Sequence, residues 1–307
     1  MNRQKIINVL PRSIRHVLEK GNLDYKIFQE IKMRIDQPII LTYEGKERML
    51  LNDWGRPHII TKEEMYEFLD YITNYSLYAY EEEMRQGFVT IAGGHRVGIA
   101  GQIVAENGKV KQIKYISSVN VRISHEILGC ADSVFFYVIQ NNQFVNTMII
   151  SPPGCGKTTL LRDMIRQLSD GNAYVKGMNV GVVDERSEIG GCYQGVPQNH
   201  LGKRTDILDC CPKVEGMMML VRSMSPQIIA MDEIGTEEDI RAIEYAVHCG
   251  CRMLVTVHGD SMVDIQSKRA FEKLLQDKVF QRFVLLNNQK KIGNIVGVFD
   301  SSGVQMG

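Results

Sequence analysis

The sequence has few of the features that mark secreted or membrane-spanning proteins. Its seven cysteines are scattered over 307 residues without a C-x-x-C pair, so we expect reduced, cytosolic thiols. A zinc site at His248, Cys249 and Cys251 is the alternative. No apolar run approaches the roughly 18 residues of a spanning helix, and the N-terminus has no apolar segment like that of a signal peptide. We therefore expect a soluble, cytoplasmic protein.

The sequence also has no excess of charge of either sign. It contains 36 lysines and arginines against 36 aspartates and glutamates, so no overall field attracts it to nucleic acid. Trp54 is the single tryptophan, and aromatic and basic residues are not interleaved as single-strand binding favours. Both observations count against nucleic acid as a partner.

What is present is an ordinary globular composition, with 44% apolar and 23% charged residues. The length allows about two domains, although no Pro- or Ser-rich linker separates them. We place the boundary where a helical stretch, 131–139, follows a region of strands. This predicts a smaller N-terminal α+β domain over residues 1–130 and a second domain over 131–307.

The N-terminal domain contains apolar patterns typical of helices and others typical of strands. Apolar residues recur at helical spacing over 6–18 and 66–72, and the second run follows the start signal Thr61-Lys-Glu-Glu64. Two short apolar runs around Glu44-Gly45 suggest a hairpin. Strand patterns follow from 88 to 124, with a turn at Asn107-Gly108.

The second domain alternates strands and helices, which predicts an α/β fold with a mainly parallel sheet covered by helices on both faces. The expected strands are 145–150, 179–184, 227–231 and 252–257, and the expected helices are 157–168, 215–224 and 236–248. Residues 282–286 and 295–299 read as an added hairpin.

An apolar strand, a glycine-containing turn and Gly-Lys-Thr at the start of a helix together form the pattern of a phosphate-binding loop, or Walker A motif. Here Ser151 stands where the usual pattern has glycine, and a coincidental turn is the alternative. Lys157 would reach the β and γ phosphates of ATP, and the Thr158 hydroxyl would bind Mg²⁺. The predicted nucleotide-binding residues are Ser151, Pro152, Pro153, Gly154, Cys155, Gly156, Lys157, Thr158 and Thr159.

Polar residues directly follow four of the predicted strands, namely Ser151, Asp184, Asp232 and His258. Because ligands bind outside the carboxyl ends of the strands in open α/β sheets, these residues predict one site at one edge.

Asp232-Glu233 follows four apolar residues and resembles a Walker B motif. Asp232 would hold Mg²⁺ through water, and Glu233 would polarise the attacking water. An acidic pair that merely caps a helix or lies in a loop is the alternative reading.

Two further candidates lie at the other strand ends. Glu185 follows Asp184 and adds a carboxylate, with a solvated loop as the alternative. His258 would contact the γ-phosphate by a hydrogen bond, with a core histidine as the alternative.

The order of these motifs resembles that of the secretion and pilus-motor ATPases. The stretches 94–101, 183–188, 201–206 and 222–226 resemble the stage III sporulation protein AA family more closely. The resemblance implies a RecA-like, Mg²⁺-dependent ATPase that forms a hexamer. It also implies a place in the mother-cell cytoplasm, where the ATPase energises a channel of membrane proteins. Arg96, Arg122 and Arg204 would help complete the nucleotide site, unless the two strand arginines simply face solvent.

Two other function classes stay open. A nucleic-acid motor of the RecA or hexameric-helicase type would be stimulated by DNA. A nucleotide-gated structural ring would bind nucleotide but release little phosphate.

Overall fold

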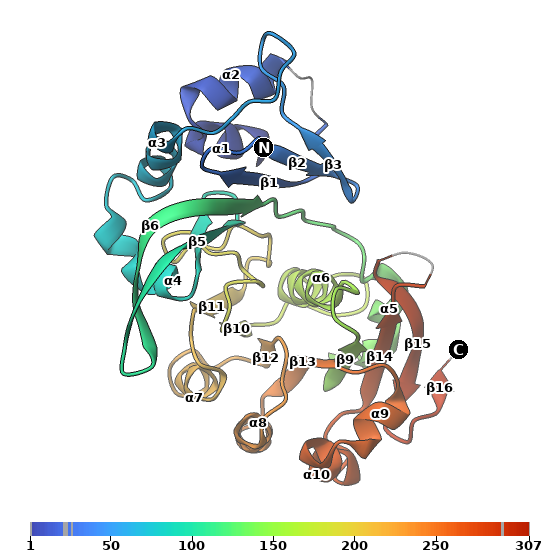
Figure 1. Cartoon of the computed structure of the whole chain (residues 1–307). Coiled ribbons are helices and arrows are strands. Elements are labelled where there is room, and N and C mark those ends of the chain that lie inside the picture. The colour runs from blue at the N-terminus through green and yellow to red at the C-terminus, as the bar shows by residue number, and fades with distance from the viewer. Residues whose placement is uncertain (1, 21–23, 26, 290–291, 307) are drawn as a thin grey trace. The chain divides into compact units, whose positions relative to one another are not determined.

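The computed structural model describes residues 2–20, 24–25, 27–289 and 292–306, and the chain divides into two compact units (Figure 1). The N-terminal unit comprises 1–125 together with 191–194, and the C-terminal unit comprises 126–190 and 195–307. The domain boundary predicted at residue 130 lies five residues after the observed one at 125. The prediction also did not assign residues 191–194 to the N-terminal unit.

The N-terminal unit is built on a six-stranded antiparallel sheet in the order β3-β2-β1-β6-β5-β4. The strands are β1 (Phe28–Arg34), β2 (Ile40–Tyr43), β3 (Lys46–Met49), β4 (Phe88–Ile91), β5 (His95–Glu106) and β6 (Lys109–Arg122). The helices are α1 (Asn2–Val9), α2 (Arg12–Lys20), α3 (Lys62–Ile72) and α4 (Glu81–Arg85), with a 3₁₀ turn η1 (Leu77–Tyr80).

Several local predictions for this unit are confirmed. Thr61 and Glu64 form a reciprocal capping box at the start of α3. The turns at Glu44-Gly45 and Asn107-Gly108 join β2 to β3 and β5 to β6. The long β1 was missed, although it lies between β2 and β6 in the sheet.

Alternation along the strands places Arg96 and Arg122 on the same face of this sheet. Their neighbours Val97 and Val121 are fully buried in the core that α1, α2 and α3 also build. Arg96 on β5 and Arg122 on β6 are directly opposite each other in register. Like charges in that position destabilise a sheet, and the contacts of Arg122 with Glu30 and of Arg96 with the Phe88 ring offset this repulsion.

The C-terminal unit contains an eight-stranded sheet in the order β11-β10-β12-β13-β9-β14-β15-β16. Its strands are β9 (Thr147–Ser151), β10 (Val180–Asp184), β11 (Thr205–Asp209), β12 (Ile228–Met231), β13 (Arg252–His258), β14 (Arg282–Asn287), β15 (Asn294–Asp300) and β16 (Gln305–Met306). A separate small hairpin is formed by β7 (Ile139–Gln140) and β8 (Gln143–Phe144).

Six of these strands, from β11 to β14, are parallel, and only β15 and β16 run antiparallel. The mainly parallel sheet expected from the sequence is therefore present. Two details differ from the prediction. The edge strand β11 was not predicted, and the first strand of the expected hairpin, β14, is itself a parallel neighbour of β9.

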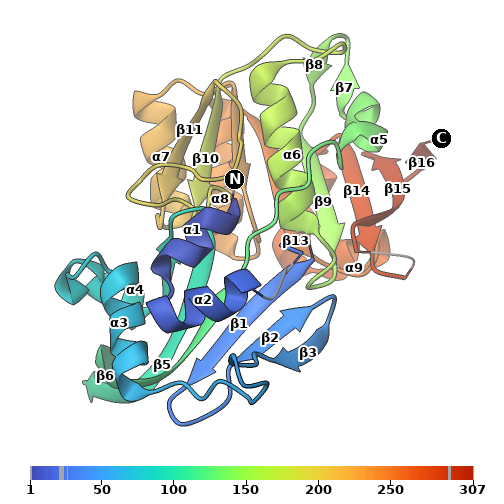
Figure 2. The ribbon, with the colours of Figure 1, turned by 90° about the horizontal axis from the view of Figure 1, so that it is seen from above.

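Helices cover both faces of this sheet, with α6 on one side and α7 and α8 on the other (Figure 1). Figure 2 shows α6 lying along the strands. The helices are α5 (Asp132–Phe135), α6 (Lys157–Asp170), α7 (Lys213–Ser223), α8 (Glu237–His248), α9 (Met262–Ser267) and α10 (Glu272–Gln276), with 3₁₀ turns η2 (Phe136–Val138) and η3 (Arg269–Phe271).

Because strand side chains alternate, successive residues contribute to two separate cores. Ile149 and Val182 pack with α5 and α6, whereas Ile150 and Val183 pack with the helices on the other face. Burial on both faces fixes the register of the strands. It thereby fixes which residues emerge at their carboxyl ends, where the candidate site lies.

Candidate nucleotide site

The loop between β9 and α6 has the backbone of a phosphate cradle. Gly154 and Gly156 have φ values of 73° and 87°, in the left-handed region that favours glycine. A side chain at Gly156 would also come within 3.3 Å of the backbone of Gly293. α6 begins at Lys157, as predicted, and presents its N-terminal amides and dipole to the loop.

The other loop residues have mainly structural contacts. Ser151 is the buried last residue of β9, and its hydroxyl donates to the Pro152 carbonyl at 2.8 Å. Cys155 is buried, and its thiol lies 3.7 Å from the Pro153 carbonyl. Thr159 lies in the first turn of α6, where its carbonyl accepts from the Cys130 thiol. The predicted nucleotide-binding segment is thus one continuous loop and helix start.

Asp232 and Glu233 lie at the end of β12, beside the loop. Thr158 Oγ1 donates to Asp232 Oδ2 at 2.6 Å, and the Thr256 hydroxyl donates to the other oxygen, Oδ1. The pair does not cap α8, because Thr236 and Asp239 form the capping box there. The alternative reading of these two carboxylates as a helix cap is therefore wrong.

Glu233 contacts three basic side chains. Its Oε1 lies 2.7 Å from Lys157 Nζ and 3.0 Å from His258 Nε2, and its Oε2 accepts from Arg186 Nη1. Burial raises the pKa of Glu233, but the hydrogen bond from Lys157 and the charges of Lys157, Arg186 and His258 lower it more, so the net pKa is below the usual value. Glu233 is therefore ionised at neutral pH.

The backbone at Glu233 is also unusual, with φ of 55°. A non-glycine residue in the left-handed region costs roughly 1–2 kcal/mol. The conformation is held from β13, because the Glu233 amide donates to Thr256 Oγ1 at 2.9 Å. Such strain concentrates at functional sites, which supports a catalytic carboxylate over an incidental one.

Asp184, at the end of β10, has a structural role. It is 2% exposed and accepts hydrogen bonds from the amides of Glu188, Ile189 and Gly190. Burial raises its pKa to about 6, although the amides oppose the rise. Asp184 fixes the turn after β10 and thereby places the residues within it.

That turn carries Glu185 and Arg186 in different directions. Glu185 pairs with Lys213 of α7, whereas Arg186 pairs with Glu233. The structure therefore brings Arg186 to Glu233 and gives Glu185 a cationic partner of its own. Both line one small hollow, together with Asp184, Glu188, Lys213, Asp232 and Glu233.

His258 ends β13, opposite Ser151 in the register of β9. Its side chain is 44% exposed, so it is not a core histidine. Its contact with Glu233 places it in the same cluster as Lys157.

The three arginines predicted to complete the site lie elsewhere in the chain. Arg204 donates to the Ser169 carbonyl at 3.0 Å, at the end of α6 opposite the loop, where it helps cap the helix. In the N-terminal unit, Arg122 is 66% exposed and lies 3.8 Å from Glu30, and the Arg96 guanidinium stacks over Phe88. Their roles at the nucleotide stay predictions.

Two basic residues at the site were not predicted from the sequence. Arg186 lay unassigned within the stretch 183–188. Arg162, on α6, is largely buried among Glu126, Asp184, Glu188 and Asp232; burial lowers its pKa, and these carboxylates oppose that effect. Its position one turn after Thr158 was the signal that could have identified it.

The residues at the loop fit a magnesium ion bound together with nucleotide phosphates. Magnesium in such sites takes one or two protein oxygens, and phosphates and waters complete its shell. The hydroxyl of Thr158 and the carboxylate of Asp232 already lie within 2.6 Å of each other. Among the described residues, no cluster of three or more His, Cys, Asp or Glu side chains forms a metal site of its own.

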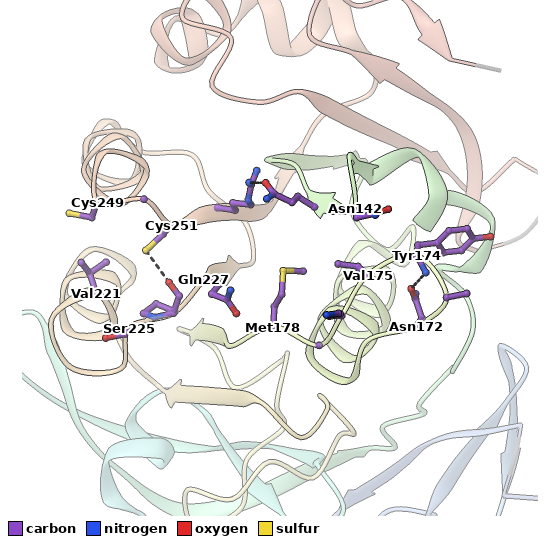
Figure 3. Close-up of a pocket in the computed structure, with 17 residues that line it drawn as sticks. Asn142, Asn172, Tyr174, Val175, Met178, Val221, Ser225, Gln227, Cys249 and Cys251 are labelled. Carbon is purple, nitrogen blue, oxygen red and sulfur yellow. Dashed lines mark hydrogen bonds between the residues drawn. The ribbon is translucent and has the colours of Figure 1, made fainter.

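A large hollow lies at the opposite edge of the same sheet (Figure 3). Met178, Gln227 and Arg252 line it at the amino ends of β10, β12 and β13. Cys251 donates to the Pro226 carbonyl within it. Since ligands of open α/β sheets bind at the carboxyl ends, this hollow is separate from the nucleotide site.

Comparison with known sequences identifies the family. The family model described as "Sporulation stage III, protein AA" matches residues 1–306. The chain belongs to the stage III sporulation protein AA family. Stage III sporulation protein AA of Bacillus subtilis (strain 168) is 41% identical over 300 residues, covering 97% of this chain and 95% of that protein.

Solved structures with the same fold include an ATPase and a pilus retraction motor. The DotB ATPase of Yersinia pseudotuberculosis has a TM-score of 0.61 at 14% identity, covering 95% of this chain and 80% of that one. The pilus retraction motor PilT with bound ADP has a TM-score of 0.58 at 15% identity, covering 92% and 77%. This member of the stage III sporulation protein AA family thus shares the α/β fold of those two proteins. In the part of the chain that the structure describes, no helix has both the length and the apolar character to cross a membrane.

Proposed function

We propose that the protein is a Mg²⁺-dependent ATPase, with its active site at the loop 151–159. The observation that carries the proposal is the convergence of Lys157, Thr158, Asp232, Glu233 and His258 at the carboxyl ends of three adjacent strands. PilT, which shares the fold, was solved with ADP. By the same proposal, this chain also binds an adenine nucleotide.

In the proposed reaction, each residue acts on a defined group. Lys157 moves from Glu233 to the β and γ phosphates, and the loop amides hold the remaining oxygens. Thr158 directly and Asp232 through water would hold Mg²⁺, which would neutralise phosphate charge when bound. Glu233, released from Lys157, orients a water and accepts its proton as the water oxygen bonds to the γ-phosphorus and the bond to ADP breaks.

We further propose that the protein works as a homo-oligomeric ring, a hexamer, on the cytoplasmic side of a membrane complex. Hydrolysis would energise the assembly of, or transport through, a channel built of membrane proteins during sporulation. The membership in a sporulation family and the fold shared with the DotB ATPase and the pilus retraction motor PilT support this proposal.

The test is phosphate release from ATP by the purified protein, with and without single-stranded DNA. We expect Mg²⁺-dependent release that DNA leaves unchanged. Stimulation by DNA would instead indicate the nucleic-acid motor. ATP binding with negligible release, also in the presence of the membrane partners, would indicate the nucleotide-gated ring.

His258 provides a further test within the same assay. If it contacts the γ-phosphate, His258→Ala should lower kcat while leaving ADP affinity nearly unchanged, because ADP lacks that phosphate. ADP and ATP affinities measured by calorimetry check this. An equal loss of both affinities together with a lower melting temperature would show a structural role instead.

A further inference from the structure

The two oxygens of Glu233 have different partners. Oε1 faces Lys157 and His258, and Oε2 faces Arg186. This division has a consequence for the proposed ATPase, on which the following inference rests. When Lys157 moves to the phosphates, it vacates Oε1 and leaves the contact at Oε2 in place.

Arg186 is built into the fold as a support for this contact. The backbone around it is fixed, since Asp184 holds the next three amides after Ser187, and Ser187 is buried with φ of 53°. Its side chain is 58% exposed and extends from the turn to Glu233. A planar guanidinium fixes the orientation of a carboxylate better than an ammonium group does.

We propose that Arg186 is the positioning residue of the general base. It holds Oε2 of Glu233 so that the vacated Oε1 faces the attacking water. The proton of the water passes to Oε1 while its oxygen bonds to the γ-phosphorus, and the electrons of the breaking bond leave with ADP. Arg186 makes no contact with the reacting atoms and is unchanged by the step.

Other charged groups also act on Glu233. Lys157 comes from α6 and His258 from β13, and Asp232 is its neighbour in the chain. Around the same hollow lie Asp184, Glu185, Glu188 and Lys213. Of all these, Arg186 is the cation that contacts Oε2, so its removal changes that oxygen selectively.

The test compares Arg186→Ala, Arg186→Lys and the matched control Arg241→Ala. Arg241 is a 77% exposed arginine that pairs with Glu237 on α8. We expect Arg186→Ala to lower kcat by about ten- to hundredfold, the range for a misplaced catalytic group, with the KM for ATP changed less than about twofold. Arg186→Lys should recover part of the rate, and Arg241→Ala should match the parent.

The effect of Arg186→Ala in a second background separates positioning from a merely structural role. In a Glu233→Gln background, Arg186→Ala should cause no further loss of rate. A raised KM with unchanged kcat, or an equal loss in both backgrounds, would overturn the proposal.

A readout independent of turnover keeps this inference distinct from the ATPase proposal. If the parent protein releases no phosphate, the ATPase proposal fails. The contact between Arg186 and Glu233 is then tested by the melting temperatures of the parent, Arg186→Ala, Glu233→Gln and the double variant. Coupled residues give non-additive changes in melting temperature. Additive changes would show that Arg186 does not support Glu233.

Discussion

Glu233→Gln is expected to slow ATP hydrolysis by about a hundredfold or more, the contribution of a general base, while ATP still binds. In the structure Glu233 holds Lys157 through a 2.7 Å ion pair. A neutral amide would hold that lysine less firmly, so ATP affinity should equal or exceed that of the parent. Lys157→Ala should instead weaken ATP binding and abolish turnover. Single-turnover phosphate release and equilibrium binding measure the two effects separately.

Glu237→Gln is the matched control for this experiment. Glu237 lies four residues later at the start of α8, is 73% exposed and contacts Arg241. Its variant should hydrolyse ATP at the parental rate. If Glu233→Gln does the same, the water-activating role of Glu233 is wrong.

The second large effect is expected from mixing inactive variants. Arginines that complete phosphoryl-transfer sites from outside contribute about 10³–10⁵ in rate, and Arg96, Arg122 and Arg204 are the predicted candidates for this role. If neighbouring subunits share the site, Lys157→Ala and Arg122→Ala should each be inactive alone. When the two variants are mixed in equal amounts and assemble at random, about a quarter of the boundaries between neighbouring subunits should combine an intact loop with an intact arginine. Activity should return at those boundaries. Arg96→Ala and Arg204→Ala are tested in the same way.

The control mixes Lys157→Ala with Glu233→Gln. Both defects lie in the part of the site that one chain supplies, so no junction becomes complete and no activity should return. Native mass spectrometry establishes that the variants co-assemble. Co-assembled rings that stay inactive in every ratio, for all three arginines, would exclude shared sites.

The parts of the fold that could be predicted are those encoded by local patterns. The strand and helix on either side of the phosphate loop follow from continuous apolar runs and from Gly156-Lys157, and Thr236 with Asp239 marks the start of α8. β11 was missed because Thr205–Asp209 mixes polar and apolar residues at a sheet edge, where one side chain in two can remain exposed.

Most members of the candidate site were predictable from the strand ends, but Arg162 and Arg186 and the contacts between residues were not. Four strand ends indicated Ser151, Asp184, Asp232 and His258, yet no local pattern indicated that Asp184 would bind backbone amides instead of ligand. That Arg186 contacts Glu233 while Glu185 contacts Lys213 depends on a turn in which Ser187 has a left-handed backbone. A single backbone angle in a turn is a product of tertiary packing, which periodicity does not encode.

The order of the strands has a consequence for how the protein is made. β9, which carries the phosphate loop, pairs with β13 and β14, and about 100 residues of chain separate it from the first of these. Long sequence separation between partners slows folding and leaves apolar strands exposed in the meantime. During synthesis, Met148, Ile149 and Ile150 therefore wait for partners until nearly the whole chain has left the ribosome. The ability to bind nucleotide should be among the last properties that the nascent protein acquires.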